Sequence, residues 1–92
     1  MKIGIYIIAN GKECLINLIP TDDVDPQFVF DAQTKYIAGT LGGTIGNPST
    51  YSSFLNGKQV DKPCVIIYAP IRNDMDNLAK NRIVAMVTKE ET

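Results

Sequence analysis

The sequence predicts an α+β domain, with a mainly antiparallel sheet of about five strands and one long helix on one face. Several apolar runs rich in β-branched and aromatic residues are bounded by Gly, Pro or Asn, which indicates strands. Only one stretch has sustained helical spacing, and it lies between the second and third runs. The expected order is therefore β-β-α-β-β-β. Most strand connections are short, which favours antiparallel pairing.

Size and charge limit the possible functions. The 92 residues, with a formal net charge of −1, are expected to form a single domain over 1–92, with 89–92 as a frayed tail. The basic residues are scattered, so neither DNA nor RNA is an expected partner. No apolar run approaches a membrane span and no signal peptide is evident, so we expect no membrane association and a cytoplasmic location.

The first two strands are predicted over residues 3–9 and 13–19. The first is apolar throughout, which indicates a central strand buried on both faces. Asn10-Gly11 between the two runs is the strongest short hairpin signal, because both turn residues take a positive φ. Pro20 ends the second strand.

The helix is predicted to begin at Asp25-Pro26 and to end at Gly42 or Gly43, which supplies a left-handed cap. Asp31 and Lys35 form an i, i+4 pair on its outer face. Gly39 lies inside the last turn, where glycine costs about 1 kcal/mol relative to alanine and often marks close backbone approach. The residues expected to face the sheet are Val29, Ala32, Tyr36, Ile37, Thr40 and Leu41.

The second half is predicted to contain a short strand at 44–45 and a polar loop over 47–58, with one helical turn at 49–55. A strand follows over 64–69. A polar excursion over 71–81, with short-helix content at 74–79, leads to the last strand at 82–88.

Residue types argue against catalysis and metal binding. The chain has no histidine, so the commonest general base and metal ligand is missing. Cys14 and Cys64 are too far apart for zinc spacing, and we expect buried free thiols, with a disulfide as the open alternative. We therefore expect no catalytic residue, no metal and no cofactor.

A glycine-rich stretch at 39–46 and the hydroxyl-rich loop after it form the candidate ligand site. Neither nucleotide-binding fingerprint is present, and a helix C-terminus disfavours phosphate. Hydroxyls and an aromatic ring in the loop, and arginines on both sides of the 71–81 excursion, nevertheless suit a phosphorylated ligand. The alternative is that the glycines only turn the chain and the arginines face solvent. The candidate residues are Gly42, Gly43, Thr44, Asn47, Ser49, Tyr51, Arg72, Arg82 and Asn81, the last holding the excursion.

Two short features of the sequence support a resemblance to a known family. They are Gly42-Gly43 after the helix and Asn81-Arg82 at the start of the last strand. The order of these features resembles a family of small, uncharacterised domains encoded by bacteriophages. The resemblance implies a small cytoplasmic protein made in an infected bacterium. Such proteins often bind host proteins or sequester host signalling nucleotides.

The first hypothesis is a non-enzymatic viral binding protein that captures a nucleotide-like or phosphorylated small molecule, such as a host defence signal. The alternative is a protein-interaction module that inhibits or scaffolds a host protein through Tyr51, Phe54 and Leu55. A hydrolase or transferase is a third reading, disfavoured by the missing histidine. Edge strands in so small a sheet also predict a homo-oligomer.

Overall fold

The computed structural model describes residues 1–71 and 80–90. Its strands form one five-stranded sheet in the order β2-β1-β5-β4-β3, and every neighbouring pair is antiparallel. One helix packs on this sheet, which confirms the predicted α+β class and element order. The elements are β1 (Lys2–Ala9), β2 (Lys12–Pro20), α1 (Pro26–Leu41), β3 (Thr44–Leu55), β4 (Lys58–Ile71) and β5 (Lys80–Glu90).

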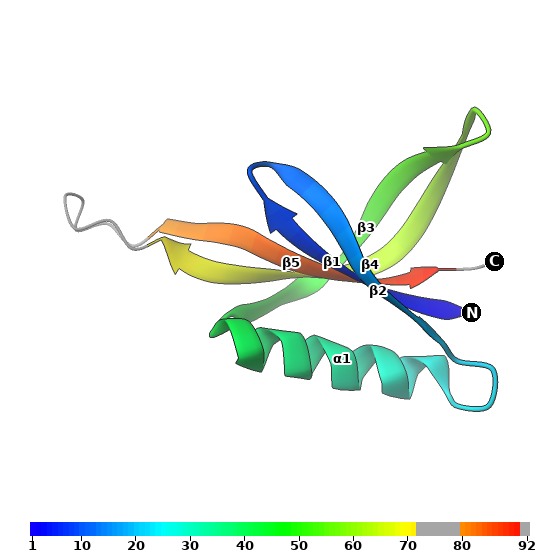
Figure 1. Ribbon diagram of the computed structural model, residues 1–92, viewed down its shortest axis with the longest axis horizontal. Helices are drawn as coiled ribbons and strands as arrows, with labels where there is room; N and C mark the ends of the chain where they lie inside the picture. The colour runs from blue at the N-terminus through cyan, green and yellow to red at the C-terminus, as the bar shows by residue number, and fades with distance from the viewer. Residues whose placement is uncertain (72–79, 91–92) are drawn as a thin grey trace.

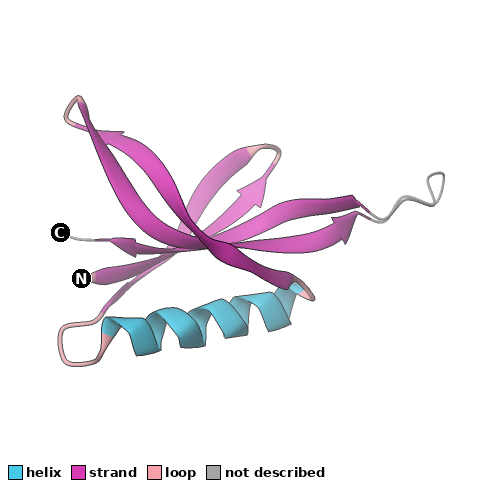
Figure 2. Ribbon diagram, turned by 180° about the vertical axis from the view of Figure 1, so that it is seen from behind, coloured by secondary structure: helices cyan, strands magenta, loops and turns pink. Residues whose placement is uncertain are grey.

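The helix lies on one side of the sheet, and the turn ends of the β1–β2 and β3–β4 hairpins project towards the other side. In Figure 1, α1 runs along one face beneath β5, β1 and β4, while the β1–β2 and β3–β4 hairpins rise away from it. The view from behind in Figure 2 shows the same two layers, with no described element over the face that the hairpins border. No helix in residues 1–71 or 80–90 is long and apolar enough to cross a membrane.

Both hairpin turns have an Asn-Gly pair in the left-handed region. Asn10 and Gly11 have φ of 53° and 74°, which confirms the predicted first hairpin. Asn56 and Gly57 repeat this conformation with φ of 53° and 78°, and they join β3 to β4. The two turns thus place the strand ends of both hairpins on the side of the sheet that lacks the helix.

The prediction of a loop over 47–58 is wrong, as is that of a helical turn at 49–55. Residues 44–55 form one long edge strand that pairs with β4 from Thr44 to Leu55. Pro48 is tolerated because it lies beside a register shift on an edge strand, where no ladder donor is needed. Pairing with an apolar neighbour therefore outweighed the weak strand propensity of this Ser- and Thr-rich segment.

The last strand is longer than predicted at both ends. It runs from Lys80 to Glu90, and Lys89 and Glu90 pair with Ile3 and Lys2 of β1, so these residues are not frayed. Their place beside β1 gives them ladder hydrogen bonds that a chain end normally lacks. The helical content predicted at 74–79 lies outside the described residues.

The helix ends are those that the sequence predicts. The Asp25 side chain accepts a hydrogen bond from the Gln27 N–H at 3.1 Å. At the other end Gly42 is left-handed, and the Gly43 N–H donates to the Ala38 carbonyl at 2.8 Å. These contacts form a Schellman cap, so Gly42-Gly43 satisfies the carbonyls at the end of the helix.

The buried face of the helix is rotated from the predicted one. Phe30, Thr34, Ile37 and Ala38 are buried against the sheet, so of the core-facing predictions only Ile37 is fully buried. Val29 is partly buried, whereas Ala32, Tyr36, Thr40 and Leu41 are exposed. The helix carries apolar residues on two faces, and spacing alone could not tell which one meets the sheet.

The main core lies between α1 and the sheet. Because side chains alternate along a strand, the odd-numbered residues of β1 and their partners on β4 and β5 point towards the helix. The buried sheet residues of this cluster are Ile3, Ile5, Val65, Ile67, Ala85 and Val87.

Both cysteines are free, but only Cys64 is buried, so the expectation of a buried thiol at Cys14 on β2 is wrong.

Candidate functional site: a groove on the open face of the sheet

The face of the sheet away from the helix carries a second, smaller apolar cluster. Tyr6, Cys64 and Met86 are buried there, with Ile66 and Tyr51 packed against them. These side chains come from β1, β4, β5 and β3, and they point away from the helix because they alternate with the core residues. This face is therefore apolar at its centre although no described element covers it.

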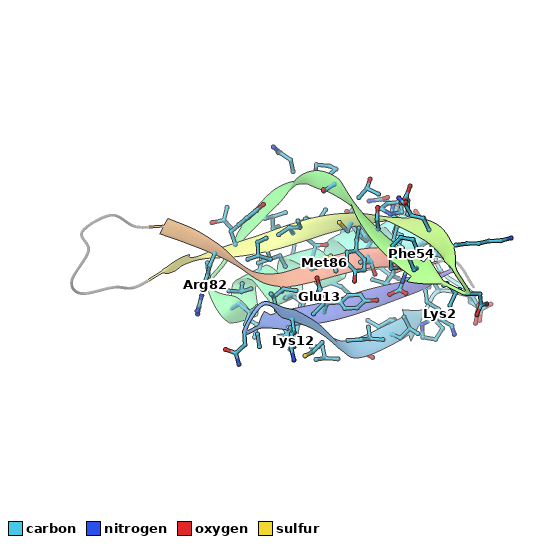
Figure 3. The ribbon with its side chains drawn as sticks, turned by 90° about the horizontal axis from the view of Figure 1, so that it is seen from above. Lys2, Lys12, Glu13, Phe54, Arg82 and Met86 are labelled. Carbon is cyan, nitrogen blue, oxygen red and sulfur yellow. The ribbon has the colours of Figure 1, made fainter. Side chains whose placement is uncertain are left out.

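A groove of about 840 Å³ runs over this face, close to the upper end of the range for small-molecule sites. Figure 3 looks down on it, with Met86 near the middle, Glu13 beside it and Arg82 towards one end of the sheet. Its floor is apolar, and its polar side chains come from β2, β3 and β5. The lining residues are Ile8, Ala9, Asn10, Gly11, Glu13, Tyr51, Ile66, Arg82, Ile83, Val84 and Met86.

Three polar side chains of the groove differ in chemistry. Arg82 on β5 offers a fork of N–H donors, Glu13 on β2 offers a carboxylate, and Tyr51 on β3 offers an aromatic ring with a hydroxyl. Both charged residues are exposed, whereas Tyr51 is half-buried. An apolar floor with a few convergent polar groups is typical of sites that bind small organic ligands.

Tyr51 is held in place by Tyr6. The two ring centroids are 6.0 Å apart and the rings are tilted by 49°, a favourable geometry for aromatic pairs. The Tyr6 hydroxyl donates to Glu90 Oε2 at 2.8 Å, so this ring is fixed at its polar end as well. Burial, followed by the hydrogen bond to Glu90 and then the negative charge of Glu90, raises the pKa of Tyr6 well above its usual value. Tyr6 therefore stays a neutral donor.

Glu90 accepts hydrogen bonds from three side chains on this face of the sheet. It accepts from Lys62 Nζ at 2.8 Å and from Thr88 Oγ1 at 3.0 Å, besides the bond from Tyr6. Burial raises the pKa of the Glu90 carboxyl, but these hydrogen bonds outweigh it, so the net pKa is lowered. With three hydrogen-bond partners from three strands, this carboxylate is a structural anchor of the sheet.

Cys64 does not supply a reactive thiol to this face. Burial raises its pKa, and the hydrogen bond with Ser49 only partly opposes that shift. Ser49 lies opposite Cys64 across β3 and β4, and its side chain forms that hydrogen bond. The thiol is therefore protonated at neutral pH.

The glycine-rich stretch lies apart from the groove. A Cβ on Gly43 would come within 2.8 Å of the Tyr68 carbonyl oxygen, and one on Gly46 within 2.9 Å of the Ile66 carbonyl oxygen. These glycines thus allow β3 to approach β4 closely, while Gly42 caps the helix. Gly42, Gly43, Thr44 and Asn47 do not line the groove, which fits the alternative that these glycines turn the chain.

Of the predicted site residues, the structure brings Tyr51 and Arg82 to one groove. Asn81 pairs through its backbone with Pro70, and Arg72 lies outside the described residues. Sequence reasoning missed Glu13, which reaches the groove because β2 folds back beside β1. The Asn10-Gly11 hairpin signal gave its place in the sheet, but not which face its side chain takes.

The chain matches no family model, and it shows no significant similarity to curated proteins or to solved structures. Within residues 1–71 and 80–90, no group of three or more His, Cys, Asp or Glu side chains is placed to hold a metal ion.

Proposed function

We propose that this protein is a non-enzymatic binding protein that captures a nucleotide-like small molecule in the groove on the open face of the sheet. The observation that supports the proposal is that Tyr51 and Arg82, from different strands, line the same groove. An aromatic ring stacks on a nucleobase, and a guanidinium holds a phosphate by paired hydrogen bonds. The pair therefore matches the two ends of a nucleotide.

Glu13 favours a nucleotide over a bare phosphate. Its carboxylate would repel an isolated anion, but it accepts hydrogen bonds from the amino groups of a base or the hydroxyls of a ribose. A groove with one cationic and one anionic side chain thus suits a ligand that has both an anionic group and hydrogen-bond donors. We place this activity in the cytoplasm, which is that of an infected bacterium under the phage resemblance.

The test is a thermal-shift screen with linear and cyclic nucleotides and with inorganic phosphate, followed by titration calorimetry. Ligand at a hundred times its dissociation constant stabilises the folded state by about 2.7 kcal/mol, a shift of several degrees in a domain of this size. We expect a nucleotide to shift the wild type and Lys58→Ala, a control at the far hairpin. Arg82→Ala should lose most of the affinity, and Arg82→Lys should recover only part.

No shift with any nucleotide would reject the proposal, and an equal shift in Arg82→Ala would remove the arginine from the site. A shift with inorganic phosphate alone would show an anion site without a role for Tyr51.

The protein-interaction hypothesis keeps one observation in its favour. Phe54 and Leu55, near the end of the β3–β4 hairpin, are 77% and 64% exposed. Phe54 and Arg82 lie towards opposite ends of the molecule, so the two hypotheses can be tested separately (Figure 3). Under this second hypothesis, Phe54→Ala abolishes capture of a host protein, whereas Arg82→Ala leaves it unchanged.

A further inference from the structure

The outward face of α1 carries two large aromatic side chains in solvent. Phe28 is 71% exposed and Tyr36 is 66% exposed. An exposed aromatic side chain on the outer face of a helix adds little to the stability of its own domain, because it buries little apolar surface there. Several such side chains on one face are typical of surfaces that bind another molecule. This face of the helix is therefore a candidate interaction surface.

Small residues lie in line with the two rings. At about 3.6 residues per turn, Phe28, Ala32, Tyr36 and Gly39 form one stripe along the helix, roughly 16 Å long. Ala32 and Gly39 are exposed, and apart from the adjoining residues and backbone of the helix itself, no atom of the described residues lies within 4 Å of the position of a Cβ on Gly39. Packing among the described residues therefore does not explain a helix-disfavouring glycine at position 39. The close approach of a second helix backbone would explain it.

The charges beside the stripe are self-complementary. Asp31 and Lys35 lie on the same edge of it, and both are exposed. The salt bridge predicted between them is absent from the described residues, and Asp31 Oδ1 accepts instead from Gln27 Nε2 at 2.9 Å. A two-fold axis perpendicular to the helix, level with residue 33, keeps this edge on the same side in both copies and reverses its direction. Asp31 of each copy then meets Lys35 of the other, and Phe28 meets the segment between Tyr36 and Gly39.

We propose that a second copy of this chain docks on the outer face of α1, with the two helices antiparallel. The four rings of such a dimer would bury roughly 500 Å² of aromatic surface, if each buries most of the 150–250 Å² usual for an aromatic side chain. That is about a third of a standard interface of roughly 1,600 Å², so the flanking charged and polar residues complete a dimer of modest affinity. The small residues between the rings allow the two helices to approach closely.

The proposal places the contact on the helix and not on the sheet edges. The edge strand β2 also exposes apolar side chains, namely Leu15, Ile16 and Leu18. However, β2 pairs with β1 through a register shift and ends at Pro20, and both features disfavour regular pairing with another strand. Its charged residues, Lys12 and Glu13, are adjacent at one end, so an antiparallel pair centred on Ile16 would not bring them together.

The test uses the charge pattern of the helix. Asp31→Lys gives a face with two lysines and Lys35→Asp gives a face with two aspartates, so each variant repels itself under the proposed symmetry. We expect sedimentation equilibrium to show at least a tenfold weaker dimer for each variant alone. An equimolar mixture should recover a heterodimer as tight as the wild type, and at high salt this recovery should decline.

Mixing distinguishes contact between copies from contact within a helix. Each variant also places two like charges four residues apart in its own helix, and mixing cannot relieve that repulsion. Ile16→Lys on β2 is the control and should leave the dimer intact, while circular dichroism confirms that all variants fold. A monomeric wild type at millimolar concentration would overturn the proposal. So would a dimer that Ile16→Lys disrupts, or charge variants that stay monomeric when mixed.

Discussion

The Tyr6 hydroxyl donates a 2.8 Å hydrogen bond to Glu90 Oε2, which ties the first strand of the chain to the last. On the other side of the same carboxylate, Lys62 of β4 completes a salt bridge at 2.8 Å in which both side chains are less than a fifth exposed. One carboxylate thus connects β1, β4 and β5, the central strands of the sheet. This relationship makes the stability of the protein sensitive to the charge of Glu90.

We expect the protein to lose stability in acid through Glu90. Because hydrogen bonds lower its pKa below 4.5 in the folded state, the stabilisation is present above pH 4.5 and is lost as the pH falls through the folded pKa. Glu90→Gln should cost about 1–3 kcal/mol at neutral pH, since Lys62 is left without its partner. Urea unfolding measured from pH 7 to pH 3 would test both effects.

The variant should also flatten the acid limb of the stability profile. Asp23→Asn, in the exposed connection before the helix, is the control and should keep the wild-type profile. If Glu90→Gln and the wild type lose stability in parallel, another carboxylate controls the acid response.

We expect Gly4→Ala to destabilise the protein, whereas Gly39→Ala should stabilise the monomer. A Cβ on Gly4 would overlap the Glu90 carboxylate and lie 2.6 Å from Thr88 Oγ1, so the anchor must move and lose hydrogen bonds. The cost should be about 1–3 kcal/mol. At Gly39 the space is open and the helix should gain up to about 1 kcal/mol. Thermal unfolding at low protein concentration measures both effects. A Gly4→Ala variant as stable as the wild type would contradict the proposed role of the Glu90 hydrogen bonds in stability.

We expect Gly43→Ala to unfold the protein more easily even without ligand. The added Cβ would meet the Tyr68 carbonyl oxygen and Ile67 Cγ2 at 2.8 Å, and a backbone atom cannot move aside cheaply. The loss should be about 2–4 kcal/mol, measured by chemical unfolding. Ser53→Ala, on the same strand, is the matched control. A variant of unchanged stability that has lost nucleotide binding would restore the glycines to the ligand site.

The sequence predicts the elements of this fold better than their faces. Asn10-Gly11, Asp25-Pro26 and Gly42-Gly43 each fix a local conformation, and the structure has a hairpin or a helix end at each of them. By contrast, β3 is held by its neighbour β4 and not by its own residues, so nothing local indicated a strand through Ser52 and Ser53. Local signals were sufficient wherever the determinant of the conformation was local.

The candidate site shows the same division. Tyr51 and Arg82 were selected for their chemistry, and pairing across β3, β4 and β5 brings them to one groove. The rotated helix face had a different cause, because Ala32 and Tyr36 follow the same spacing as true core residues although both are exposed. An apolar stripe that faces a second molecule has the same pattern as one that faces a core.

The position of β5 between β1 and β4 also sets the order of events during synthesis. The last strand lies in the middle of the sheet, and Ile3 pairs with Lys89 across nearly the whole chain. Until residues 80–90 leave the ribosome, the β1–β2 hairpin and the β3–β4 hairpin have no shared partner, and the core beneath α1 cannot close. Folding therefore waits for residues 80–90 and is slowed by a high contact order, and the apolar strands need protection from aggregation while the chain is being made.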